Sequence, residues 1–229
     1  MTYSENNKIE SFVSRQGHED ALEPDLPIID PHHHLWDNRA STSIFEQKLY
    51  LCDEIMADIN ESGHNITQTV FAQCGAFYRQ DGPEEFRSVG ETEFAQGVAA
   101  MSRSGAYGST RLCSGIFGFA DLRAGTNAES VLQAHLTASP NFRGIRTAFP
   151  SDLNSKYLEG FALLAKYELS FDHYSPDFKK LPLLAKLASS NPDVTVIVNH
   201  LGGTVDLTAD KETFETWKQY IKTVAASQN

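Results

Sequence analysis

The sequence repeats one pattern six times between residues 26 and 226: a short apolar run, then a longer stretch with apolar side chains at helical spacing. The short runs have strand length, and most are rich in β-branched and aromatic residues. Each pair takes about 33 residues, close to the roughly 30 or more of a strand–helix–strand unit. The pattern therefore predicts an α/β fold, in which helices cover a parallel sheet.

The expected strands cover residues 26–30, 66–73, 112–119, 142–146, 169–172 and 194–199, and the expected helices cover residues 45–61, 83–103, 128–138, 158–167, 181–190 and 214–226. An open doubly wound sheet and a closed barrel both fit this order of elements. No GxGxxG follows the first strand, and neither GxxxxGKS nor GxxxxGKT occurs in the sequence. The sequence therefore lacks the main motifs that would identify the chain as a dinucleotide-binding or P-loop protein.

The chain has 229 residues, of which 41% are hydrophobic and 21% charged, enough for one sizeable core. We expect a single domain over residues 25–229, preceded by a flexible polar arm at residues 1–24. The net charge of -11 argues against nucleic-acid and membrane-surface partners, because an acidic surface repels phosphates. The three widely spaced cysteines form no disulfide framework, and no signal sequence is evident, so we expect a cytoplasmic location.

Histidines gather at the ends of the predicted strands, where parallel α/β folds carry their chemistry. Three of them, His32, His33 and His34, follow the first strand. Alternation along a strand places His32 and His34 on one side and His33 on the other. Two neutral imidazoles on one side can share a divalent cation such as zinc. His32 and His34 are therefore candidate metal ligands, and His33 is expected to pack or support them.

Three further strand-end residues are candidates for contact with a substrate. His200 is followed by two glycines, which let backbone and ligand approach closely, so it is a candidate metal ligand or substrate contact. Arg146 can hold a carboxylate with two parallel hydrogen bonds, whereas Arg143 faces the opposite side of the same strand. His173 is a candidate ligand for substrate after the fifth strand.

The remaining polar residues carry less weight. Asp121 and Gln73 are weaker strand-end candidates, and His18, His64 and His135 are expected at the surface, in the arm, a loop and a helix.

Several segments resemble the amidohydrolase-related (amidohydrolase 2) family, in the branch that contains lactone hydrolases and pyrone-dicarboxylate lactonase. IDPHHHLWD at residues 29–37 resembles the family's opening strand. Others follow in the family's order at residues 70–84, 89–94, 142–146, 160–164, 169–172 and 191–203, the last being NPDVTVIVNHLGG. Each segment alone is a modest match to the family. Together the matches run in the family's order over about residues 26–217 and are specific to it.

The resemblance implies a TIM-type (β/α)8 barrel of the metal-dependent hydrolase superfamily. It implies that His32, His34 and His200 hold a divalent metal, with zinc as the first candidate, although some members of this branch work without a tightly held metal. It also implies a hydrolase that opens a small lactone or cyclic ester with activated water. His200 would hold the carbonyl or the metal. Arg146 and His173 are expected to contact the substrate from their strand-end positions, and His173 lies near the family's fifth-strand histidine but out of register with it. Sister groups hydrolyse amides or decarboxylate their substrates.

The sequence departs from the family at its carboxyl end. The family's water-activating aspartate ends an eighth strand, whereas this pattern stops after about six units, so we expect a shortened barrel. Asp206 and Asp210 follow His200 too closely to end another strand. One alternative is therefore a catalytically impaired homologue that binds a ligand or a partner, and a third hypothesis is an unrelated open α/β binding module. A barrel with open strand edges predicts a homo-oligomer that covers them.

Overall fold

A computed structural model describes residues 19–37, 49–203, 211–227 and 229 of the chain. Most of the predicted amino-terminal arm and the beginning of the predicted helix at residues 45–61 lie outside this part. Residues 19–26 contain turns and bends but no helix or strand. No described helix is long and apolar enough to cross a membrane.

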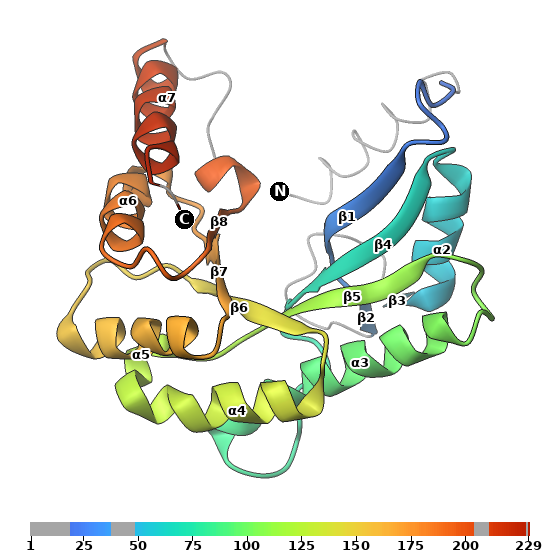
Figure 1. Ribbon diagram of the computed structural model, residues 1–229, viewed down its shortest axis with the longest axis horizontal. Coiled ribbons are helices and arrows are strands. Elements are labelled where there is room, and N and C mark those ends of the chain that lie inside the picture. The colour runs from blue at the N-terminus through green and yellow to red at the C-terminus, as the bar shows by residue number, and fades with distance from the viewer. Residues whose placement is uncertain (1–18, 38–48, 204–210, 228) are drawn as a thin grey trace. The chain divides into compact units, whose positions relative to one another are not determined.

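Six strands pair in their sequence order, β1-β4-β5-β6-β7-β8, among the described residues (Figure 1). Their bounds are Pro27–His33, Asn65–Ala72, Arg111–Gly118, Phe142–Ala148, Ser170–Tyr174 and Val196–Val198. The pairs β1–β4, β5–β6, β6–β7 and β7–β8 are parallel. Sequential parallel order is that of a TIM-type β/α barrel, whereas the strand order of a doubly wound sheet reverses at a switch point. The fold is therefore six β/α units of the barrel type.

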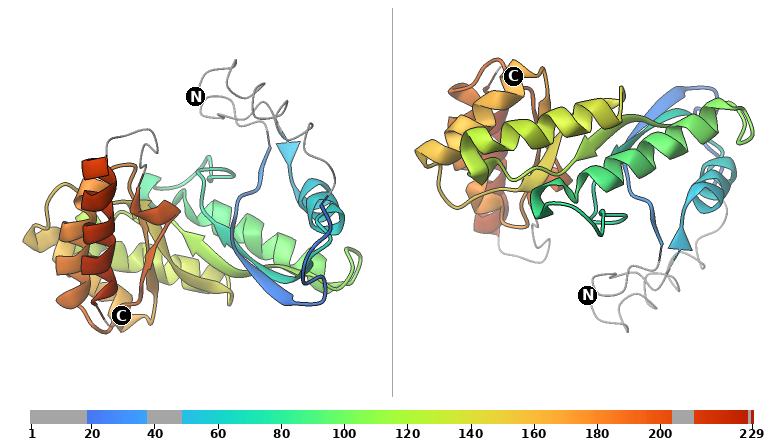
Figure 2. Two further views of the ribbon diagram at one scale, coloured as in Figure 1. Left: turned by 90° about the horizontal axis from the view of Figure 1, so that it is seen from above. Right: turned by 90° about the horizontal axis from the view of Figure 1, so that it is seen from below.

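Helices connect the successive strands. The α-helices are α2 (Cys52–Glu61), α3 (Val89–Arg103), α4 (Ala128–Ala138), α5 (Ser155–Lys166), α6 (Leu181–Ser189) and α7 (Lys211–Ala225). Short 3-10 helices are η1 (Glu84–Phe86), η2 (Leu122–Asn127), η3 (Phe178–Lys180) and η4 (His200–Gly202). Helices α6 and α7 pack against each other, as the two views of Figure 2 show.

The chain divides into two compact units, and β5 contributes residues to both. Unit 1 comprises residues 1–77 and 94–114, and unit 2 comprises residues 78–93 and 115–229. The expectation of a single domain over residues 25–229 stays a prediction. In unit 1, Leu35, Phe71 and Leu112 are fully buried. In unit 2 the largest fully buried side chains come from β5, β6, β7 and the helices that follow them: Ile116, Leu122, Leu132, Ile145, Tyr157, Phe161, Leu164, Phe171 and Leu181.

Helix α5 lies directly against η2 because Gly160 has no side chain. A Cβ at Gly160 would lie 2.1 Å from the carbonyl oxygen of Leu122. Only glycine permits two backbones to approach this closely. This contact sets the position of the loop after β5 within unit 2.

The structure adds elements that the sequence pattern did not predict. Trp36–Asp37 (β2) pairs antiparallel with Leu49–Tyr50 (β3), and the rings of Trp36 and Tyr50 stack 5.1 Å apart.

The helix predicted over residues 83–103 is divided into η1 and α3. Pro83 is extended (φ -60°, ψ 141°) just before η1, so helical structure begins after it.

Candidate active site

Arg146 of unit 2 lies at the centre of a polar cluster formed by the carboxyl ends of β6, β7 and β8. Arg146 pairs in register with Asp172 on the neighbouring strand, so both side chains leave the same face of the sheet. Arg146 Nη2 lies 3.3 Å from His200 Nε2, and its guanidinium carbon lies 4.6 Å from the centre of the Tyr174 ring. Its side chain is buried, so the cation is held among a carboxyl group, an imidazole and an aromatic face.

The contact between Arg146 and His200 defines the protonation state of the imidazole. A guanidinium has only donors, so His200 Nε2 accepts this hydrogen bond and carries no proton. Burial and the nearby Arg146 charge both lower the pKa of His200. His200 is therefore a neutral imidazole at neutral pH.

Asp172 is the acidic member of this cluster and is almost fully buried. Its Oδ2 lies 4.0 Å from Arg146 Nε, and its Oδ1 accepts a hydrogen bond from Asn199 Nδ2. Burial raises the pKa of Asp172 to about 6, although Asn199 and Arg146 act in the opposite direction. Near neutral pH the carboxyl group is ionised, but it gains a proton far more readily than an exposed aspartate.

The turn after β8 places His200 next to Arg146 through an unusual backbone. His200 and Leu201 adopt positive φ angles of 48° and 57°. Gly203 follows with φ 138°, and a Cβ there would lie 2.6 Å from the Phe178 backbone nitrogen. The sequence NHLGG thus encodes a tight turn packed against η3, in which glycine is required for steric reasons.

His173 lies on the opposite face of β7 from Asp172 and Tyr174. It is fully buried, and its ring meets Phe149 edge-on at 5.0 Å. Neither ring nitrogen has a hydrogen-bond partner among the described residues. Burial lowers the pKa of His173 to about 4. The structure therefore does not bring His173 together with Arg146 and His200, contrary to the expectation that all three contact one substrate.

In unit 1, His32 and His34 direct their Nε2 atoms toward each other, 3.1 Å apart. His34 Nδ1 lies 2.7 Å from the carbonyl oxygen of Ala72, at the carboxyl end of β4. A carbonyl fixes the proton on Nδ1, so His34 Nε2 accepts from His32 Nε2 and carries the lone pair that a metal would take in place of this hydrogen bond. Two nitrogens bound to one tetrahedral zinc lie about 3.3 Å apart, so this pair fits two positions of a zinc site.

The three predicted metal ligands are divided between the two compact units, with His32 and His34 in unit 1. No group of three or more His, Cys, Asp or Glu side chains that could hold a metal ion occurs among the described residues. His200, the third predicted ligand, belongs to unit 2, where its Nε2 accepts from Arg146. His32 and His34 are therefore the residues whose geometry supports the metal prediction.

His33 points away from this pair, as strand alternation predicts. It is buried, its Nε2 lies 2.8 Å from Thr69 Oγ1, and the Cys113 sulfur lies 3.9 Å away. Burial lowers its pKa to about 4. His33 thus packs the end of β1 onto the neighbouring strands of unit 1.

His135 was expected at the surface but is fully buried. Its Nδ1 lies 2.8 Å from Thr92 Oγ1, its Nε2 lies 2.9 Å from the Phe119 carbonyl oxygen, and its ring stacks on Phe142 at 4.8 Å. The signal was present in the sequence, because His135 continues the buried face of α4 formed by Ala128, Val131 and Leu132. His64 is exposed as predicted, whereas His18 lies outside the described residues.

The weaker candidate Asp121 has a local structural role. It caps η2 by accepting from the Arg123 backbone and forms two further hydrogen bonds with the Arg123 side chain. These contacts hold the pKa of Asp121 below its usual value. The other weak candidate, Gln73, is half-buried in unit 1.

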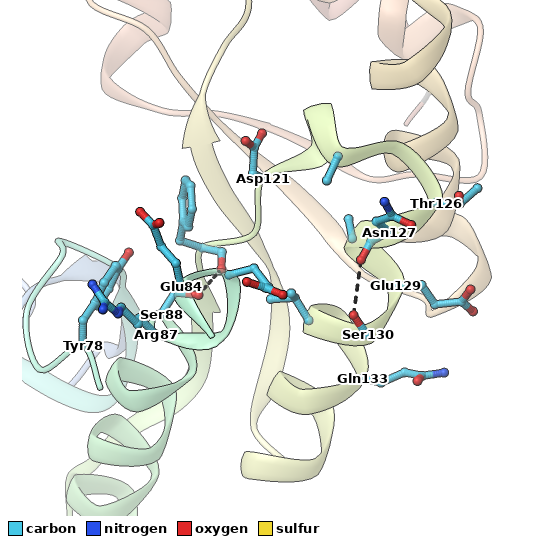
Figure 3. A pocket seen from close by; sticks show the side chains of 15 residues that line it. Tyr78, Glu84, Arg87, Ser88, Asp121, Thr126, Asn127, Glu129, Ser130 and Gln133 are labelled. Carbon is cyan, nitrogen blue, oxygen red and sulfur yellow. Dashed lines mark hydrogen bonds between the residues drawn. The ribbon is translucent and has the colours of Figure 1, made fainter. Parts of the chain in front are cut away.

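A hollow of about 1190 Å³ in unit 2 lies apart from the Arg146 cluster, between η1 and the first turn of α4 (Figure 3). Neither Arg146 nor His200 lines it. Its polar side chains do not converge: Glu129 and Gln133 lie far from Tyr78 and Arg87 in the view of Figure 3. Glu129 is engaged by Lys166 and Tyr167, so the Arg146 cluster remains the better candidate site.

Comparisons with known proteins agree with this fold. A family model described as Amidohydrolase matches residues 29–229. An uncharacterized protein of Sinorhizobium fredii, y4mH, is 30% identical over 234 residues, with 90% of this chain and 71% of the relative covered.

Two solved structures are similar in fold. Amidohydrolase 2 from Bifidobacterium longum subsp. infantis matches with a TM-score of 0.57 and 22% identity, covering 89% of this chain and 71% of its own. A probable 2-pyrone-4,6-dicarboxylic acid hydrolase from Acinetobacter baumannii, solved with citric acid bound, matches with a TM-score of 0.56 and 14% identity, covering 88% of this chain and 66% of its own.

Proposed function

Since this chain belongs to the amidohydrolase family, we propose that it hydrolyses the ring ester of a small lactone that carries a carboxylate. The observation that carries this proposal is the buried Arg146 guanidinium, held beside the neutral His200 imidazole and the Tyr174 ring. A buried arginine with an ordered planar fork suits a carboxylate better than it suits a neutral group. The Acinetobacter baumannii protein, described as a probable hydrolase of a dicarboxylated pyrone, adds support.

Each residue of the cluster has a role in this proposal. Arg146 binds the substrate carboxylate and thereby fixes the position of the lactone ring. The face of Tyr174, which already lies against the guanidinium, provides an apolar wall for a flat ring. When substrate is bound, the unprotonated Nε2 of His200 exchanges its contact with Arg146 for a hydrogen bond from the attacking water, takes up the proton of that water, and returns it to the ring oxygen that leaves as an alcohol when the ring opens.

A divalent metal fits the histidine pair of unit 1. His32 and His34 would hold it through their Nε2 atoms, and the Ala72 carbonyl would keep His34 in the required tautomer. Such a metal, when bound, polarises an ester carbonyl and makes water a stronger nucleophile at neutral pH. Zinc suits two imidazole ligands.

A second candidate function is ligand binding without catalysis. The carboxyl group that faces Arg146 in unit 2 is Asp172, which is buried and engaged by Asn199. A carboxyl group in that position supports Arg146 rather than activating a water molecule. Amide hydrolysis and decarboxylation remain the family alternatives. The cytoplasmic location, the exclusion of nucleic-acid and membrane partners, and the homo-oligomer remain predictions.

The test is an assay of the purified chain with 2-pyrone-4,6-dicarboxylate and a panel of carboxylated and uncharged lactones, with added zinc and after treatment with a chelator. We expect ring opening of at least one carboxylated lactone and none of its uncharged counterpart. Binding of carboxylated lactones without turnover would support the second candidate. Neither binding nor turnover by folded protein would contradict both.

A further inference from the structure

We propose that Asp172 and Asn199 are positioning residues that hold the Arg146 guanidinium and the His200 imidazole in place before a ligand arrives. The inference rests on the proposed function, because it assigns to these two residues the preorganisation of the proposed carboxylate site. Neither residue needs to touch the substrate.

Asp172 is placed to orient Arg146 by the sheet itself. The two residues are register partners on β6 and β7, and the side chains of both are buried. Asp172 Oδ2 lies 4.0 Å from Arg146 Nε, whereas a different nitrogen of the guanidinium, Nη2, contacts His200. The guanidinium is therefore held by a hydrogen bond at Nη2, by the charge of Asp172 on the side of Nε, and by the Tyr174 ring at its face. An arginine held in this way loses little further freedom when it binds a carboxylate.

Asn199 connects the same carboxyl group to the turn that carries His200. Its side-chain nitrogen donates to Asp172 Oδ1, and its backbone carbonyl accepts from Gly202 N at 2.8 Å, which closes the turn. The next residue, His200, has a positive φ of 48°, a conformation that a non-glycine residue keeps only when its surroundings enforce it. The Asn199 side chain supplies one of these constraints at the start of the turn.

A simpler role for Asp172 predicts the opposite effect of Asp172→Asn on anion binding. If Asp172 only neutralised Arg146, it would compete with the ligand carboxylate, and Asp172→Asn would strengthen anion binding. If Asp172 positions Arg146, the same substitution weakens anion binding although it removes a negative charge. Asn199→Ala removes the hydrogen bond from Asn199 to Asp172 without changing any charge. It therefore distinguishes the effect of the position of Arg146 on anion binding from the effect of the local charge.

The first measurement is calorimetric binding of glutarate, a plain dicarboxylate, to the full chain near pH 7.5. We expect Asp172→Asn and Asn199→Ala each to bind about tenfold more weakly than the wild type, as expected when a binding group is misplaced. The control is Asp193→Asn, because Asp193 is exposed in the loop before β8, and its binding should equal that of the wild type. Binding by Asp172→Asn that is equal to or tighter than wild type would overturn the proposal.

The second measurement needs no ligand. In a protein labelled with nitrogen-15 at arginine, Arg146→Lys assigns the Nε–H signal of Arg146, which we expect to be resolved and slow to exchange in the wild type. Both Asp172→Asn and Asn199→Ala should broaden it or move it to the position of exposed arginines, with unchanged melting temperature in at least Asn199→Ala. An unchanged Arg146 signal in Asn199→Ala would overturn the positioning role, even if Asp172→Asn fails to fold. Loss of the signal in the variants together with neither binding nor turnover of any carboxylated lactone by the wild type would contradict the proposed function and leave the positioning role supported.

Discussion

Arg146 is the residue on which the proposed chemistry depends most. It is buried, and a different neighbour contacts each part of the guanidinium: His200 accepts from Nη2, Asp172 lies 4.0 Å from Nε, and Tyr174 covers the face. A lysine cannot reproduce this arrangement, because an ammonium is a compact point charge without a planar fork. Charge and shape are therefore both required at this position.

The first prediction concerns this shape requirement. Arg146→Lys should weaken the binding of carboxylated lactones about tenfold or more, because charge is kept but two parallel hydrogen bonds are lost. The matched control is Arg143→Lys on the same strand, whose side chain is exposed and bonds the Pro140 carbonyl instead. Titration calorimetry with both variants tests this prediction. Full retention of affinity in Arg146→Lys would show that charge alone is sufficient.

The second prediction concerns the histidine pair of unit 1. His34→Ala should lower the affinity for zinc at least about tenfold, because one of the two facing Nε2 atoms is removed. His64→Ala removes an exposed histidine of the same unit and should leave zinc affinity unchanged. Competition with a chromogenic zinc chelator measures both. Equal affinity in the two variants would contradict a metal role for the pair.

Alternation and strand-end position predicted a large part of the candidate site from the sequence. They placed His32 opposite to His33 and selected Arg146 and His200, which the structure brings together. The role of Tyr174 could not be predicted, because its contact with Arg146 depends on how β6 and β7 align. His173 lies on the other face of β7, because strand alternation decides which of two adjacent residues faces the cluster, and its contact with a substrate stays a prediction.

At the scale of elements, long amphipathic segments were predicted well and short ones were missed. Helix α4 has the predicted bounds, residues 128–138, because it buries one continuous face. The β2–β3 ribbon has two residues in each strand, too few for any periodicity. Its position depends on the stacking of Trp36 on Tyr50, a contact between residues far apart in the sequence.

The third prediction concerns the contact between α5 and η2. Gly160→Ala should destabilise the protein by about 3 kcal/mol, because the added methyl group meets the Leu122 backbone and cannot be accommodated by rotating a side chain. Gly97→Ala is the control, since Gly97 lies in helix α3 with nothing within 4 Å of the added methyl group. It should stabilise the protein by up to about 1 kcal/mol through helix propensity. Urea unfolding of both variants tests the prediction, and a neutral Gly160→Ala would contradict the close packing.

At the scale of the whole molecule, buried histidines make stability depend on pH. His33, His135 and His173 each have a pKa lowered to about 4 by burial, from 6.5 in the unfolded chain. The unfolded state therefore binds more protons between about pH 6.5 and 4, and stability falls as pH falls through this window. Asp172 acts oppositely, because its pKa is raised to about 6, so the folded state takes up its proton first.

The fourth prediction follows from this balance. Each of the three histidines should lower the free energy of unfolding by about 2 kcal/mol at pH 5 relative to pH 8. Protonation of Asp172 should raise it by about 1 kcal/mol over the same range. The free energy of unfolding should therefore fall by several kcal/mol between pH 8 and pH 5. Urea unfolding across this range measures the change. Constant stability over these values would contradict the burial of the three imidazoles.

The proposed function requires Arg146 to bind a carboxylate on the lactone ring. The decisive test compares the affinity of the protein for one lactone with and without its negative charges. Calorimetry would measure the affinity of the wild type and of Arg146→Ala for 2-pyrone-4,6-dicarboxylate and for its dimethyl ester. We predict that the wild type binds the dicarboxylate at least about tenfold more tightly than the ester, and that Arg146→Ala abolishes this preference. Equal affinity of the wild type for both compounds, or a preference that survives the loss of Arg146, would contradict carboxylate recognition by this residue.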